Sequence, residues 1–103
     1  MPRCKVELLT EARFQLRDIA TVYKVKVGVK SAQKITNRIL AALRKLEDFP
    51  ELGVIPQSAL LEKGEFRMLI VDEYLCFYSR EGDTLYVNQI LHGSVDYAKW
   101  LLR

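Results

Sequence analysis

The stretch from Phe66 to His92 constrains the fold of this chain more than any other part. It reads FRMLIV, a two-residue break, YLCFYS, a second break at REGD, and then TLYVNQILH. Runs rich in β-branched and aromatic residues, separated by short polar turns, predict a three-stranded antiparallel meander. Strand side chains alternate between the two faces of a sheet, so Met68 and Ile70 face one way whereas Leu69 faces the other. Both faces are therefore apolar, and each needs a cover.

The size and composition of the chain predict a single domain spanning residues 1–103. A chain of 103 residues can bury one hydrophobic core but is too short for two. Half of the residues are hydrophobic and 28% are charged, which is typical of a globular protein. The longest apolar runs fall well short of a membrane span, and no signal-peptide pattern opens the chain. We therefore expect a cytoplasmic protein with no membrane partner.

The two cysteines, Cys4 and Cys76, fall inside predicted strands and lack the spacing of a metal site. Isolated cysteines in a cytoplasmic protein are usually buried and reduced. We expect two buried thiols, no metal site and no cofactor.

A strand and two helices are predicted before the meander. Residues 3–9 alternate as a strand, and Thr10 is expected to cap a helix of roughly four turns. Residues 24–30 are interpreted as a connector together with the start of the next helix. That second helix has the clearest amphipathic pattern in the chain and runs from Ser31 to Phe49, where Pro50 ends it.

A surface loop at residues 50–64 leads into the meander, and Asp96 is predicted to cap a short last helix. The order β-α-α-β-β-β-α indicates an α+β domain, with a helical hairpin packed on one face of a mainly antiparallel four-stranded sheet. The hairpin supplies one cover. The last helix, a homodimer mate or a partner protein would cover the second face, and the sequence leaves these alternatives open.

Positive charge is concentrated in the first half of the chain. Residues 1–50 hold eleven Lys and Arg against five Asp and Glu, whereas residues 51–103 hold five against eight. This asymmetry is compatible with an acidic or nucleic-acid partner, although solvated helix faces are often basic as well.

Several motifs, through their order and spacing, resemble the RelE/ParE superfamily, the toxins of type II toxin–antitoxin systems, which include plasmid stabilisation proteins. The motifs are LTEAR at the first helix, LEDFPELG at the end of the second, FRMLIVDEYLCFYS in the meander and VNQILHGSVDY at its end. The resemblance implies a toxin that inhibits growth until a cognate antitoxin wraps around it and buries apolar surface. It also implies that DNA is bound only through the antitoxin, and no recognition helix for DNA is evident here.

The superfamily implies one of two targets. RelE-like members cut messenger RNA on the ribosome, whereas ParE-like members inhibit DNA gyrase. RNA cleavage without a metal needs groups that move protons and cations that stabilise the charge on phosphorus. The candidate catalytic residues for a nuclease are His92, the sole histidine, Arg67 as a phosphate ligand and Tyr78 as a source of a hydroxyl.

Other positions depart from the nuclease pattern. Leu69, Leu75 and Val95 stand where RelE-like toxins tend to carry basic residues, and the meander half of the chain is net negative. We therefore favour a ParE-like gyrase inhibitor. The alternatives are a metal-independent endoribonuclease (mRNA interferase) and a non-toxic interaction protein of the same fold. In the favoured interpretation Leu69, Leu75 and Phe77 form a partner-binding face together with Arg67.

Overall fold

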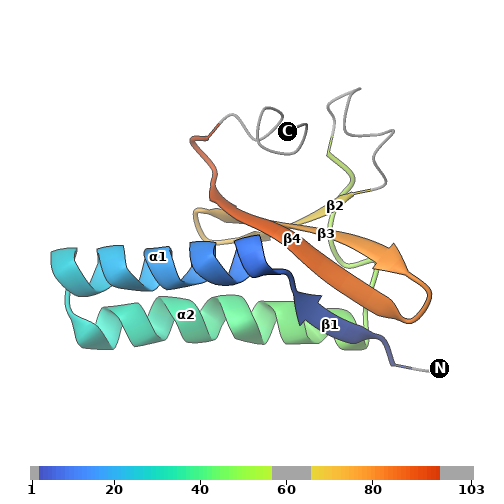
Figure 1. Cartoon of the computed structure of the whole chain (residues 1–103), viewed down its shortest axis with the longest axis horizontal. Helices are drawn as coiled ribbons and strands as arrows, with labels where there is room; N and C mark the ends of the chain where they lie inside the picture. Colours follow the sequence, from blue (N-terminus) through green and yellow to red (C-terminus); the bar gives the residue numbers. More distant parts are fainter. Residues whose placement is uncertain (1–2, 57–65, 96–103) are drawn as a thin grey trace.

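The computed structural model describes residues 3–56 and 66–95, which form two helices packed against a four-stranded sheet (Figure 1). The elements in chain order are β1 (Lys5–Leu8), α1 (Thr10–Lys26), α2 (Val29–Arg44), the 3-10 turn η1 (Lys45–Glu47), β2 (Arg67–Val71), β3 (Tyr74–Glu81) and β4 (Thr84–His92). The strand order is β1-β4-β3-β2; β1 runs parallel to β4, and the other pairs are antiparallel. The predicted α+β class is confirmed. The predicted last helix, from Asp96, lies outside the described residues.

Helices α1 and α2 form an antiparallel hairpin that covers one face of the sheet (Figure 1). Apolar residues recur at helical spacing on both helices, so each helix presents one apolar stripe to the strands. Complete burial of one such side chain, for example Ile39, stabilises the fold by about 1.5–3 kcal/mol. The buried residues between the hairpin and the sheet form one cluster: Cys4, Ala12, Ile19, Ile35, Ile39, Leu43, Leu46, Leu69, Val71, Tyr74, Cys76, Tyr78, Leu85, Val87 and Ile90.

Both cysteines lie in this cluster as free thiols, as the sequence predicted. Burial raises the pKa of the Cys76 thiol to about 12. A thiol in this setting stays protonated at neutral pH and is a poor nucleophile.

The start of α1 differs from the prediction, because Thr10 is the first helical residue and not the cap. Leu9 occupies the cap position, with extended backbone and no side-chain cap hydrogen bond. The backbone N–H of Leu9 still bonds to the carbonyl of Val87 on β4, while its own carbonyl accepts the N–H of Arg13. The chain therefore passes from strand pairing to helix within one residue, which leaves Thr10 no room to act as a cap.

The link between α1 and α2 is shorter than the predicted connector. Helix α1 continues to Lys26, and only Val27 and Gly28 separate it from α2. The backbone N–H groups of both link residues donate to the carbonyl of Tyr23, which closes the end of α1. Gly28 has a φ of 133°, a conformation that L side chains rarely adopt, so glycine is required at this turn.

The meander is confirmed, with one change at its second turn. Two-residue turns, Asp72–Glu73 and Gly82–Asp83, join its strands, and the first residue of each turn has a positive φ. The REGD segment is not wholly a break, because β3 continues through Glu81. A β-bulge between Phe77 and Tyr78 shifts the pairing of β3 with β4.

Helix α1 completes the edge of β4 beyond the end of β1. Strand β1 pairs with β4 only as far as the Leu8–Val87 pair. Further along, the side-chain oxygen of Gln15 accepts the backbone N–H of Ile90 at 2.6 Å, and the Gln15 amide nitrogen donates to Gln89. A single glutamine on a helix thus takes the place of a strand partner for β4.

Candidate functional site

Arg67 and Tyr78, two of the predicted site residues, lie opposite each other on β2 and β3. The segment Pro50–Gly53, which follows η1, passes beside this pair. The hydroxyl of Tyr78 donates to the carbonyl of Pro50 and accepts the backbone N–H of Gly53, both at 2.9 Å. Nη1 of Arg67 donates to the carbonyl of Gly53 at 3.0 Å and more weakly to that of Glu51 at 3.5 Å. Both side chains therefore hold this segment against the sheet.

Glycine is required at position 53 because the ring of Tyr78 approaches the backbone there. A Cβ on Gly53 would lie 2.7 Å from both Cε1 and the hydroxyl oxygen of Tyr78, and 3.0 Å from the carbonyl of Met68. The segment is also paired at its far end, where Val54 exchanges two backbone hydrogen bonds with Met68. The LEDFPELG motif thus ends in a glycine, and the absence of a side chain there allows Tyr78 to hydrogen-bond to the backbone of the loop.

The chemical availability of Tyr78 is low. Its side chain is 1% exposed, and its hydroxyl already donates one hydrogen bond and accepts another. Burial raises the pKa of Tyr78, and the Gly53 N–H and the nearby Arg67 only partly oppose that effect. A tyrosine in this state is poorly suited to move protons at neutral pH.

The depression beside Arg67 is too small for a nucleotide. It is lined by Pro50, Glu51, Arg67, Tyr78, Ser79 and Arg80 and has a volume of about 80 Å³. Pockets that enclose small-molecule ligands usually measure about 300 Å³ or more. The other cation here, Arg80, donates through Nε to the carbonyl of Gly82 at 2.9 Å.

His92, the last residue of β4, pairs with Tyr74 at the start of β3, far from Tyr78 on the same strand. Tyr74 and Tyr78 are four residues apart on one strand, which separates their Cα atoms by roughly 13 Å. The structure therefore does not bring His92 together with Arg67 and Tyr78. The three predicted catalytic residues belong to two separate places.

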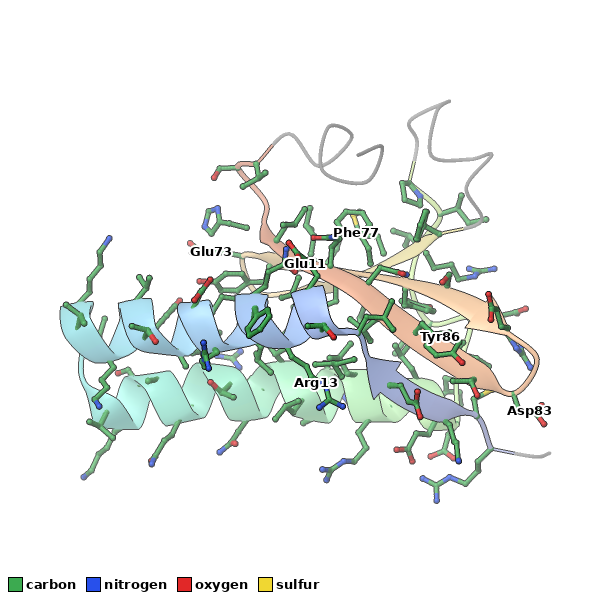
Figure 2. The ribbon with its side chains drawn as sticks, in the orientation of Figure 1. Glu11, Arg13, Glu73, Phe77, Asp83 and Tyr86 are labelled. Atoms are coloured by element: carbon green, nitrogen blue, oxygen red, sulfur yellow. The ribbon has the colours of Figure 1, made fainter. Side chains whose placement is uncertain are left out.

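The surroundings of His92 form a small polar cluster at the β2–β3 turn. Nδ1 of His92 accepts the backbone N–H of Ser94 at 3.1 Å and lies 2.8 Å from the Ser94 hydroxyl. Nε2 lies 3.4 Å from a carboxylate oxygen of Glu73, and the ring packs edge-on against Tyr74 at 5.5 Å between centroids. Because Nδ1 accepts a backbone N–H, the neutral ring carries its proton on Nε2, toward Glu73. These contacts fix the end of β4, and Glu73 marks that end of the sheet in Figure 2.

Two of the four predicted partner-binding residues, Leu69 and Phe77, are buried, whereas Arg67 and Leu75 are partly exposed. Leu69 belongs to the core cluster beneath the helices, and Phe77 has no exposed surface although it lies on the face away from the hairpin (Figure 2). Leu75 is half-buried, and Ile70 beside it is 59% exposed. Leu69 and Phe77 thus lie on opposite faces of the sheet and offer almost no surface to a partner in this structure (Figure 2).

Sequence patterns alone miss a different exposed surface, at the turn between α1 and α2. Residues 24–30, interpreted as a connector from their alternating pattern, place valines and lysines in solvent at the end of the hairpin. The alternation of apolar and cationic residues is the signal of this surface. The same alternation is typical of a strand, but here Lys24–Lys26 end α1 and Val29 and Lys30 begin α2, with Val27 and Gly28 as the link between them.

The described residues contain neither a cluster of metal-binding side chains nor a helix that could span a membrane. Residues 3–56 and 66–95 contain no group of three or more His, Cys, Asp or Glu side chains placed to bind a metal ion. No helix in the described part of the chain is long and apolar enough to cross a membrane.

Comparison with known proteins identifies the family. A family model described as the ParE toxin of the type II toxin–antitoxin system, parDE, matches residues 6–97. The chain belongs to the ParE toxin family. The resemblance inferred from the sequence motifs is therefore confirmed, and it falls on the ParE side of the superfamily.

The fold agrees with a solved ParE-related structure. The structure described as the chromosomal ParDE TA system from P. aeruginosa matches this ParE-family chain with a TM-score of 0.75 and covers 89% of this chain and 98% of that chain. The sequence identity is 16%, so this likeness concerns the fold. A search of curated proteins gave no match.

Proposed function

We propose that this ParE-family chain is a toxin that arrests bacterial growth by inhibiting DNA gyrase, without cutting RNA, until a cognate antitoxin neutralises it. One observation carries the choice of a non-nuclease mechanism. The residues that a nuclease of this superfamily would need are either engaged in structural contacts, as Arg67 and Tyr78 are, or set apart at the other end of the sheet, as His92 is.

The charge of the meander supports the same proposal. Residues 66–95 contain two arginines against four acidic residues, so this part of the chain carries a net charge of −2 apart from His92. Contacts to phosphate dominate the affinity of proteins for nucleic acid. A sheet that cradled RNA would be positively charged, and this one is not.

The proposal is tested with one preparation of the chain in two assays. We expect inhibition of supercoiling by purified gyrase, and intact messenger RNA in a translation extract. Cleavage of the messenger with unaffected supercoiling would replace the proposal with the endoribonuclease alternative. Activity in neither assay, together with normal growth on induction, would indicate an interaction protein of this fold.

Two variants sharpen the choice. His92→Ala should remain toxic, because its polar contacts lie away from the Arg67–Tyr78 pair. Arg67→Ala should weaken toxicity, because the segment at Glu51–Gly53 loses its side-chain support. Circular dichroism verifies that both variants fold. Loss of toxicity in folded His92→Ala alone, together with messenger cleavage by the unmodified chain, would favour acid–base catalysis.

A further inference from the structure

The end of the helical hairpin carries an exposed apolar surface that the fold does not use. Figure 1 shows the α1–α2 turn at one end of the molecule, beyond the edge of the sheet. Four valines there, Val22, Val25, Val27 and Val29, are between 47% and 80% exposed. Single exposed apolar residues are ordinary, but four within eight positions at one turn are a concentration of the kind that marks an interaction site.

Lysines lie between these valines. We call the surface formed by Val22, Lys24, Val25, Lys26, Val27, Val29 and Lys30 the valine–lysine tip. Residues 19–46 contain seven Lys and Arg and no Asp or Glu. In the described part of the chain, one of these seven, Arg38, forms an ion pair, with Asp72. The three lysines of the tip have no acidic partner there, so their charges are uncompensated.

Hydrogen bonds hold the backbone of the tip in place, and a groove lies beside the tip. Val27 and Gly28 are held by hydrogen bonds to the carbonyl of Tyr23, so the turn presents its side chains from a fixed position. Beside it, a groove of about 330 Å³ runs between α1 and α2, with Lys24 and Val29 at the tip and the small side chains Ala20 and Ala32 in its lining. A partner that contacts the tip can extend a side chain into this groove.

We propose that the valine–lysine tip is a docking surface for an acidic, apolar-containing segment of the cognate antitoxin. The proposal rests on the function proposed above, which requires such a partner. Acidic side chains would compensate the tip lysines, and apolar ones would remove the valines from water. The four exposed valines argue against a nucleic acid, because a sugar–phosphate backbone has no apolar surface that would cover them. The adjoining groove argues against a membrane surface, because a bilayer cannot enter it whereas a peptide side chain can.

The test uses the full chain and the purified antitoxin encoded by the reading frame next to it. The variant Lys24→Glu/Lys26→Glu/Lys30→Glu reverses the charge of the tip. The matched control, Lys5→Glu/Arg44→Glu/Lys45→Glu, reverses three exposed cations away from it. We expect the tip variant to bind the antitoxin about tenfold or more weakly than the unmodified chain, and the control to bind it within about twofold. Raising the salt concentration should weaken binding of the unmodified chain more than that of the tip variant.

Growth assays separate this proposal from the proposed function. The tip variant should still arrest growth, but co-expressed antitoxin should no longer restore it. Equal binding and full rescue of the tip variant would overturn the docking proposal and leave the function intact. Loss of toxicity in the folded tip variant, with antitoxin binding unchanged, would also overturn it, because the tip would then contact the target. Absence of toxicity in the unmodified chain would instead overturn the proposed function.

Two further measurements keep the test decisive. Val25→Ser/Val27→Ser retains every charge and should also weaken antitoxin binding, so the result does not depend on one variant. Hydrogen exchange on the unmodified chain should show amides of residues 22–30 slowed by the antitoxin, and unchanged exchange there would overturn the proposal. Binding of the unmodified chain to phosphatidylglycerol vesicles, lost in the tip variant while antitoxin binding is kept, would assign the tip to a lipid surface instead.

Discussion

The hydroxyl of Tyr78 on β3 accepts the backbone N–H of Gly53 at 2.9 Å, and the ring lies where a side chain at position 53 would otherwise stand. The same hydroxyl donates to the carbonyl of Pro50. One strand tyrosine therefore satisfies two backbone groups of the segment that leaves the helical hairpin. Two motifs that are far apart in the sequence, FPELG and YLCFY, meet in this one contact.

Removing the Tyr78 hydroxyl should destabilise the fold. In Tyr78→Phe the carbonyl of Pro50 and the N–H of Gly53 lose their partner in a buried setting, and we expect a cost of about 1–3 kcal/mol in the free energy of unfolding. Urea denaturation measures it. The control is Tyr86→Phe, at a half-buried tyrosine on β4 whose hydroxyl has no hydrogen bond within the described part of the chain. Equal stability of the two variants would show that the hydrogen bonds of the Tyr78 hydroxyl contribute nothing to the free energy of unfolding.

A methyl group at position 53 should be poorly tolerated. Gly53→Ala places a Cβ 2.7 Å from the Tyr78 ring, so the loop or the ring must shift, and overpacking of this kind costs about 1–3 kcal/mol. The control is Gly93→Ala, where the nearest atom, the carbonyl of Glu73, lies at an ordinary contact distance of 3.4 Å. Thermal unfolding compares the two. A larger drop in the melting temperature for Gly93→Ala would contradict this account.

Replacing Gln15 should expose the edge of β4. Gln15→Leu leaves the backbone N–H of Ile90 without its acceptor, and we expect a loss of about 1–3 kcal/mol together with faster exchange of the Ile90 amide. Amide exchange followed by NMR measures this at the residue itself. Gln33→Leu, at an exposed position of α2, should leave that amide unchanged. Unaltered protection of Ile90 in Gln15→Leu would mean that the side chain is not its partner in solution.

Stability should fall in strong alkali partly because of Tyr74. Burial, with added contributions from Tyr23 and Glu73, raises the pKa of Tyr74 to about 12 in the folded chain, whereas an unfolded tyrosine has a pKa of about 10. The folded state then holds this proton more tightly, so the contribution is complete below about pH 10 and is lost as the pH rises through about 12. Unfolding free energies at pH 7, 9, 10 and 11 should fall less steeply for Tyr74→Phe than for the unmodified chain. If the unfolding free energies of both proteins fell with pH at the same rate, Tyr74 would not be the cause of the alkaline loss of stability.

Local signals in the sequence predict much of the architecture correctly. The meander, the helical hairpin and the two buried cysteines follow from periodicity, turn residues and spacing, which act over a few neighbouring positions. Errors arise where a distant segment decides the local structure. Thr10 does not cap α1, because Leu9 is still hydrogen-bonded to Val87 on another strand.

The candidate site is less predictable for the same reason. The sequence predicts one partner-binding face that holds both Leu69 and Phe77, but Leu69 lies in the core cluster beneath the helices and Phe77 on the face away from the hairpin (Figure 2), and both are buried. The sequence marks Arg67 and Tyr78 as site residues without any sign that their polar groups hold the Pro50–Gly53 segment. Hydrogen bonds between residues more than ten positions apart leave no periodic trace in a sequence.

The sequence by itself determined the family, the order of the helices and strands up to the end of β4, and the apolar character of both faces of the meander. Hydrophobic periodicity and turn chemistry are encoded residue by residue, which is why these features follow from the amino-acid sequence alone. Only the tertiary structure decided which polar side chains are free to act. In the folded chain Tyr78 contacts Gly53, His92 lies apart from Arg67, and the valines and lysines of the α1–α2 turn are exposed to solvent. Each of these outcomes depends on which distant segments of the chain meet.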